Sequence, residues 1–135
     1  MEALFLFPEA RRRDPAIDAW FAQGDALRSL VQPWYERLRD CGADVRDLIH
    51  DGRPTACVEE AAFAYVDAYA THANIGFFCG ADLDDPAHLL EGTGKRMRHV
   101  KLRFNRMPDE AALCALLANA YKDMRRRLDE PRPQH

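Results

Sequence analysis

The stretch AAFAYVDAYATHANIGFFCG, residues 61–80, decides the fold class that the sequence predicts. Residues 63–69 alternate aromatic side chains with small or branched ones, and residues 75–79 place Ile, Phe and Cys at every second position. Alternation with a period of two is typical of strands in a sheet with at least one buried face. Only Thr71 and His72 lie clearly between the two runs, so we predict that the runs form a β-hairpin.

A further strand is predicted downstream in RHVKLRF, residues 98–104. Val100, Leu102 and Phe104 alternate with basic residues there, which predicts one dry face and one wet face. We expect this strand to pair with the hairpin in a single sheet.

The connection to this strand begins with DLDDPAHLLEG, residues 82–92. It predicts an acidic loop that enters one or two helical turns. Asp85 is the expected N-cap, and Pro86 is expected at the first helical position, where its missing N–H costs nothing.

Helices are predicted on both sides of the sheet-forming region. Residues 14–24 have an aspartate cap, a proline in the first turn and a glycine stop. Residues 25–42 repeat apolar side chains at helical spacing, and Pro33 predicts a kink or a fresh start within that stretch. Residues 109–128 form an apolar stripe with acidic residues at the start and three arginines at the end, which complements the helix dipole.

Two short segments precede the hairpin. VRDLIH, residues 45–50, fits either a strand or a short helix. HDGRPTA, residues 50–56, is predicted to be a turn, because Asp51 and Gly52 tolerate positive φ and Pro54 fixes the exit.

This order of elements predicts an α+β fold in which an antiparallel β-sheet meander packs against N-terminal and C-terminal helices as a two-layer sandwich. A chain of 135 residues fits one domain, so we assign residues 1–135 to a single domain. Residues 1–12 and 129–135 are expected to be loosely ordered termini.

Composition favours a cytoplasmic globular protein. Hydrophobic residues make up 47% of the chain and charged residues 30%, which is too apolar for disorder. The net charge of −3 argues against a dedicated nucleic-acid or membrane binder, because attraction to phosphates needs a basic excess. No run approaches the length of a membrane span, and the first residues lack the pattern of a signal peptide. The four cysteines lack CxxC spacing, so we expect free thiols, no metal and no cofactor.

LLEGTGKRMRHVKLRF, residues 89–104, combines two glycines with several basic residues in the manner of a phosphate-binding loop. A P-loop needs Gly-x-x-x-x-Gly-Lys-Ser/Thr between a strand and a helix. Leu89 stands at the first glycine position, Arg96 stands at the hydroxyl position, and a strand follows. We therefore predict a turn that feeds the strand, with small-anion binding by turn amides and basic side chains as the alternative hypothesis. The residues of that alternative site are Gly92, Gly94, Lys95, Arg96 and Arg98.

Histidines supply the remaining candidates. His50 and Asp51 precede Cys57, a combination that suggests a nucleophilic dyad or metal ligands. Adjacent residues on an extended chain point in opposite directions, so turn stabilisation is the favoured interpretation, and we assign no catalytic residue. His72 and His99 either satisfy backbone groups in the sheet or bind a ligand.

The run HDGRPTACVEEAAFAYVDAYATHANIGFFCGADLDDPAHLLEGTGKRMRHVKL, residues 50–102, resembles the YdhG-like family, a widespread bacterial domain of unknown function. The resemblance extends through PWYERLRDCGADVRDL, residues 33–48, and the last predicted helix. It implies an α+β fold with an antiparallel sheet and helices from both ends of the chain, and no catalytic residues come with it. One branch of the family has been proposed as frataxin-like iron chaperones, which implies acidic residues exposed on a helix and a sheet edge.

We therefore expect a small non-enzymatic domain that binds a ligand or a protein. The alternatives are a frataxin-like iron-binding chaperone and an enzyme of unknown class that uses His50, Asp51 or His99. The expected partner is a small ligand or a protein, with no nucleic acid and no membrane, and the chain is expected to be a monomer or a weak homodimer. Iron handling requires a compact carboxylate cluster on one surface, and an enzyme requires a cleft with converging titratable groups.

Overall fold

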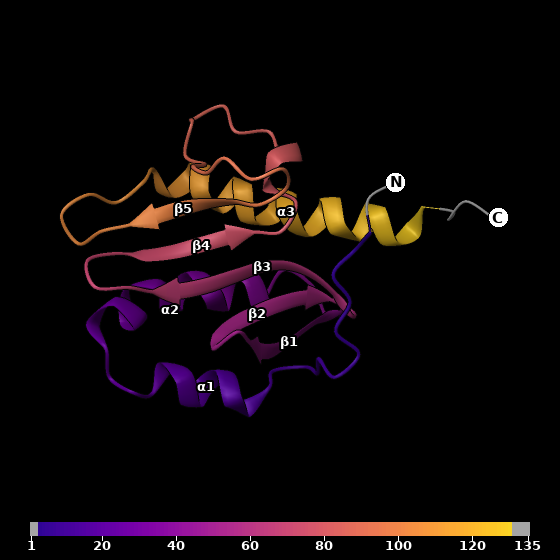
Figure 1. The fold of residues 1–135 in the computed structure, drawn as a ribbon, viewed down its shortest axis with the longest axis horizontal. Helices are drawn as coiled ribbons and strands as arrows, with labels where there is room; N and C mark the ends of the chain where they lie inside the picture. Colours follow the sequence, from indigo (N-terminus) through magenta and orange to yellow (C-terminus); the bar gives the residue numbers. More distant parts are fainter. Residues whose placement is uncertain (1–2, 131–135) are drawn as a thin grey trace.

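A five-stranded antiparallel meander forms one layer of the protein, and α2 and α3 lie behind it in the view of Figure 1. The computed structural model describes residues 3–130. The elements in chain order are α1 (Pro15–Phe21), α2 (Ala26–Arg39), β1 (Val45–His50), β2 (Arg53–Val58), β3 (Ala61–Ala68), β4 (Ala73–Phe77), η1 (Gly80–Asp82), β5 (Arg98–Leu102) and α3 (Glu110–Asp129). The strands follow one another across the sheet in sequence order, which confirms the predicted α+β two-layer fold.

The turn predicted over residues 50–56 is shorter in the structure, where it joins β1 and β2 in a hairpin. Asp51 and Gly52 form its turn with φ of 52° and 75°, as expected for this pair. The residues that follow, Arg53–Val58, form strand β2 instead of continuing the turn. They pair with β1 on one side, and residues 55–58 pair with β3 on the other side. The segment at 45–50 is a strand, so the short-helix alternative is wrong.

The predicted hairpin between β3 and β4 is confirmed, and β5 pairs with β4. Two details differ from the prediction. Phe104 was expected on the dry face, but β5 ends at Leu102 and Phe104 is 62% exposed. No α-helix forms in residues 82–92, where the carboxylate of Asp85 instead accepts hydrogen bonds from the amides of Leu89 and Leu90, both at 2.8 Å.

Aspartate side chains cap all three α-helices. Asp14 accepts from an amide of the first turn of α1, Asp25 does so for α2, and Asp109 does so for α3. Each cap satisfies an amide that has no partner within its helix. The predicted fresh start at Pro33 is wrong, because α2 continues through it. None of the helices in residues 3–130 has both the length and the apolar character needed to span a membrane.

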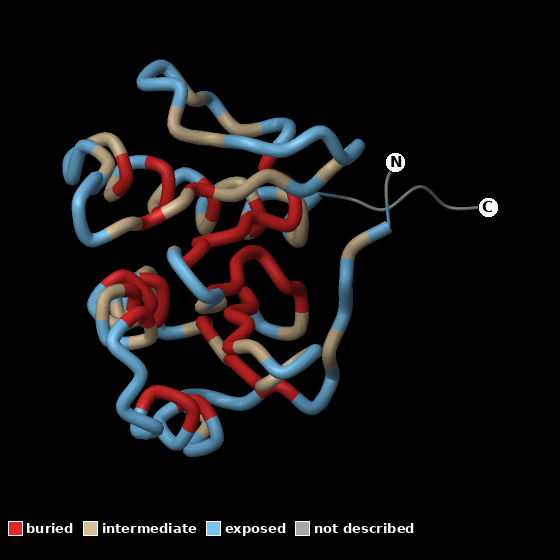
Figure 2. The backbone as a smooth tube through the Cα atoms, turned by 60° about the vertical axis from the view of Figure 1, so that its left-hand side comes forward, coloured by how far each residue is buried: buried red, intermediate tan, exposed pale blue. Residues whose placement is uncertain are grey.

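The main core lies between the sheet and the helices. Strand residues that face the helices, such as Val58, Phe63, Ile75 and Leu102, are at most 2% exposed. Their partners on the helices include Ile17, Val31, Leu38, Leu113, Leu117 and Met124. In Figure 2 the buried segments gather in the strands and the helix faces turned toward them, while the loop between η1 and β5 is mostly exposed.

The opposite face of the sheet carries Leu48, Cys57, Tyr65, Asn74 and Lys101, and we name it the open face. The N-terminal segment crosses part of it and buries a smaller apolar cluster.

This N-terminal segment pairs with the sheet at two places. Leu6 bridges to Ala61, and Arg11 bridges to Asp47. The expectation of a loosely ordered terminus did not anticipate these bridges. The C-terminal residues 129–135 were also expected to be loosely ordered, and of these residues 131–135 lie outside the described residues.

A buried polar network ties α1 and α2 to β1. Arg39 and Asp47 are each 1% exposed, and Arg39 Nε donates to Asp47 Oδ2 at 2.7 Å. The same carboxylate accepts from the Tyr35 hydroxyl at 3.0 Å and from the Asp14 amide at 2.7 Å. Burial alone lowers the pKa of Arg39, but hydrogen bonds to Asp47 and Asp18 outweigh it and raise that pKa above the ordinary value. The network therefore holds an ion pair inside the fold.

Candidate functional site

The glycine turn does not gather its basic side chains around one point. The guanidinium of Arg98 donates to the carbonyls of Gly94 and Met97, the latter at 2.7 Å. Arg96 extends toward the N-terminal segment, where it donates to the Ala3 carbonyl at 2.6 Å and lies over the ring of Phe5. Two of the three basic side chains of the anion hypothesis thus contact the chain's own carbonyls.

The two glycines of this turn also differ from each other. Gly92 has a φ of 123°, a conformation that favours glycine, whereas Gly94 has no positive φ. The turn interpretation therefore holds for Gly92. Lys95 is exposed, and the small-anion site stays a prediction.

The histidine candidates lie on opposite edges of the sheet. His50 ends β1, where Nε2 lies 3.4 Å from Asp51 Oδ2, whereas His99 lies in β5. Four strand spacings separate these edges, a distance of roughly 19 Å. Cys57 is buried in β2 opposite Arg46 and Ala62. The structure does not bring His50, Asp51 and His99 together.

A depression lies along the outer edge of β5. We call it the β5-edge groove, and it has a volume of about 630 Å³. Its lining residues are Ala87, His88, Leu89, Glu91, Val100, Lys101, Arg103, Arg106, Met107 and Pro108. One wall is the loop before β5, the other is the segment between β5 and α3, and the strand edge is the floor.

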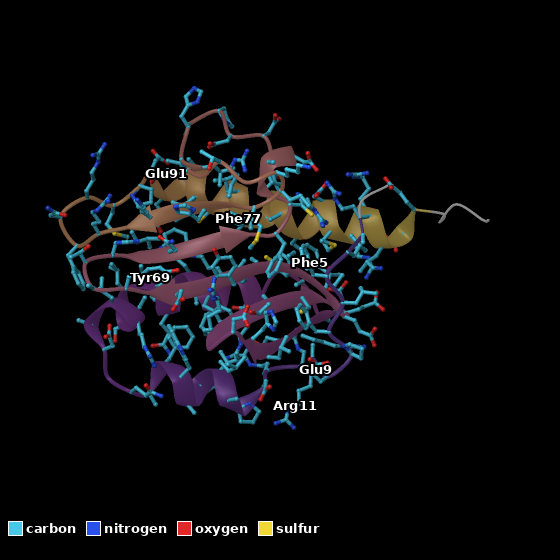
Figure 3. All side chains as sticks on the ribbon, viewed as in Figure 1. Phe5, Glu9, Arg11, Tyr69, Phe77 and Glu91 are labelled. Carbon is cyan, nitrogen blue, oxygen red and sulfur yellow. The ribbon has the colours of Figure 1, made fainter. Side chains whose placement is uncertain are left out.

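Backbone pairing explains why this edge is open. Glu91 and His99 exchange two hydrogen bonds, with N···O distances of 2.8 and 3.0 Å, so the loop forms one antiparallel rung on β5. Figure 3 labels Glu91 on this outer side of the strand. Backbone groups alternate in direction along a strand, so the N–H and C=O of Lys101 point outward as those of His99 do. Continued pairing would place Leu89 opposite Lys101, but no bridge joins these two residues, and the Leu89 amide donates to the Asp85 carboxylate instead.

The groove concentrates basic side chains in a protein whose net charge is −3. Lys101 Nζ lies 3.6 Å from Glu91 Oε1, the one carboxylate in the lining. Within residues 3–130, neither Arg103 nor Arg106 forms an ion pair. Most arginines elsewhere, such as Arg125, are paired with carboxylates.

The cations of the groove also act on a nearby histidine. Desolvation lowers the pKa of His72, and the neighbouring cations Lys101 and Arg103 lower it further. The groove is therefore electrostatically suited to an anionic group.

A polar row on the open face leads into the groove. Asp67, Asn74 and Lys101 lie opposite one another on β3, β4 and β5. Asn74 is 7% exposed, and its Oδ1 has no hydrogen-bond partner among the described residues. Arg53 Nε lies 3.5 Å from Asp67 Oδ2 and extends the row to β2.

Sequence reasoning missed this surface. Lys101 and Arg103 were assigned to the wet face of a strand, and His88 and Arg106 were not singled out at all. Their basic character was the available signal, but no spacing motif connects residues 88, 101, 103 and 106.

Metal binding has no geometric support in the described part of the chain. Among residues 3–130, no three His, Cys, Asp or Glu side chains are grouped so that they could hold a metal ion. The four cysteines are free thiols, two of them buried.

Comparison of the chain with protein-family models, curated proteins and solved structures finds no match. The resemblance to the YdhG-like family accordingly stays a prediction.

Proposed function

We propose that this protein is a cytoplasmic, non-enzymatic binding module of the YdhG-like type, and that it recognises carboxylate groups of its partner in the β5-edge groove. The observation that supports this proposal most is that Lys101, Arg103 and Arg106 all line one open groove. Among residues 3–130, Lys101 is paired with Glu91, whereas Arg103 and Arg106 have no ion pair. Guanidinium groups suit carboxylates because their parallel N–H donors match the two oxygens.

A carboxylate already occupies one end of this groove. Glu91 Oε1 lies 3.6 Å from Lys101 Nζ there, so this part of the lining is complementary to an acidic side chain. Binding is favoured over catalysis because the titratable candidates lie on opposite edges of the sheet. Iron handling is not favoured by any observation on the described residues.

The test is a titration of isotopically labelled protein, followed by backbone amide shifts. The probe is an acetylated and amidated peptide of alternating glutamate and valine, and its neutral match replaces glutamate with glutamine. We expect the acidic peptide to shift amides of residues 88–91 and 100–107 and the neutral peptide to shift none. The Arg103→Gln, Arg106→Gln double variant should bind the acidic peptide about tenfold more weakly, which is a loss of about 1.4 kcal/mol.

A matched double variant, Arg46→Gln with Lys122→Gln, removes the same total charge away from the groove. It should bind like the wild type. Equal weakening by both double variants would show only a general charge effect and would refute the proposal. A loss confined to Lys95→Gln would instead place the anion at the glycine turn.

A further inference from the structure

We infer that the partner is an extended peptide segment with acidic side chains, which adds to β5 as a further antiparallel strand opposite Lys101. This inference rests on the binding role proposed above and specifies the partner and its mode of attachment. Its basis is the combination of an unoccupied strand edge with cations on one face of that edge.

The first rung of such a strand is already present. Glu91 pairs with His99 in antiparallel orientation, and its carboxylate points toward Lys101. The next outward-facing backbone groups belong to Lys101, and no loop residue pairs with them. A residue of the partner that exchanged two hydrogen bonds with Lys101 would repeat the arrangement seen at Glu91.

The strand that fits here is short. The Glu91 rung closes one end of the edge, and at the other end the Arg103 carbonyl accepts from the Arg106 amide at 3.1 Å. The partner therefore pairs over about three residues, a length of roughly 10 Å, and leaves the edge at both ends.

The two faces of the edge predict the pattern of the partner. Side chains directly opposite each other on paired strands share a face, so the residue opposite Lys101 lies on the open face near Arg103. An acidic side chain is complementary there. The residues on either side of it face the other way, toward Leu89, Val100 and Met107 in the groove lining, where apolar side chains are complementary. The expected partner thus alternates acidic and apolar residues.

Methylation of peptide amides separates backbone pairing from charge recognition. In the antiparallel register described above, the glutamate amides of the alternating peptide face β5 and the valine amides face solvent. We therefore compare the unmodified peptide with two versions of identical charge, one N-methylated at every glutamate and the other at every valine.

The glutamate-methylated peptide should bind the wild-type protein at least about tenfold more weakly than the unmodified one, whereas the valine-methylated peptide should bind within about twofold of it. In the complex with the unmodified peptide, the amide of Lys101 should exchange with solvent more slowly than in the free protein. Equal binding of the two methylated peptides, or greater loss on valine methylation, would overturn the added strand. Carboxylate recognition would survive that result, whereas failure of the unmodified peptide to bind would refute the proposed function itself.

Discussion

At the scale of single residues, Gly76 shows how the open face depends on the absence of one side chain. The ring of Tyr65 on β3 crosses β4 at this glycine, and a Cβ built there would overlap the ring atoms Cε1 and Cζ. Arg53 in turn lies over the same ring, with Cζ 4.7 Å from its centre. The glycine is thus required by space and not by backbone conformation, since its φ is not positive.

We predict that Gly76→Ala destabilises the protein by about 1–3 kcal/mol, because the tyrosine ring must leave its place. Glycine to alanine otherwise stabilises by about 0.4–1 kcal/mol through the unfolded chain, so the sign of the effect is diagnostic. Urea unfolding measures it. Gly94→Ala is the matched control, because the nearest atom to its added Cβ is 3.9 Å away, and it should be neutral or stabilising. A neutral Gly76→Ala would show that Tyr65 moves freely.

At the scale of elements, α3 is attached to the start of β1 through Asp44. The Tyr121 hydroxyl donates to Asp44 Oδ1 at 2.6 Å, and Arg125 donates to Oδ2 at 3.0 Å. Desolvation pushes the pKa of Asp44 upward, but these two hydrogen bonds outweigh it and hold the pKa below its usual value. The hydrogen bond to Asp44 also raises the pKa of Tyr121 to about 12.

This pKa shift predicts a pH dependence. A carboxyl group with a depressed pKa in the folded state contributes stability that is present above its unfolded pKa of about 4 and is lost as pH falls through the folded value. Asp44→Asn should therefore lower the urea midpoint near neutral pH, and the gap to the wild type should shrink below about pH 4. Asp84→Asn, an exposed carboxyl, should leave the midpoint unchanged across the range. A gap that stayed constant down to acid pH would contradict the role of the Asp44 charge.

The elements also show what the sequence can and cannot predict. Helix α3 was predictable because it has one buried and one exposed face, so period 3.6 appears in its residues. The β3–β4 hairpin is buried on both faces over most of its length, and it was predictable because residue size and type alternate along it with period two. Strand β2 was missed because it shows no such alternation. Residues 54–58 are all buried, and Pro54 resembles a turn.

The β5-edge groove was not predictable because its lining comes from two separate segments, residues 87–91 and 100–108. The Leu89 amide, which would face β5 if the pairing continued beyond Glu91, donates to the Asp85 carboxylate instead. No local pattern in the sequence reports such a competition.

At the scale of the whole molecule, the Arg39–Asp47 pair joins α2 to β1 inside the fold. Asp47 accepts from Tyr35 and Arg39 of α2 and from the N-cap residue of α1. Removing one partner of a buried ion pair leaves the other charge without compensation.

We predict that Asp47→Asn costs about 3–5 kcal/mol of folding stability. Arg13→Gln is the surface control, because Arg13 lies 2.9 Å from Glu36 with both side chains partly exposed, and its loss should cost no more than about 1 kcal/mol. Urea unfolding of both variants at neutral pH gives the comparison. Similar costs for the two would mean that the buried pair contributes no more than a surface one.

The N-terminal segment has a consequence for the order of events during synthesis. Its first bridge joins Leu6 to Ala61, so the segment has no place to dock until translation has passed β3. At about 5–20 residues per second, Phe5, Leu6 and Phe7 wait roughly 3–11 s as apolar residues in a nascent chain. The hairpins of the meander need only neighbouring residues and form first, since local contacts close faster than distant ones. These apolar residues therefore reach their native positions only after the strand that they pair with has been made.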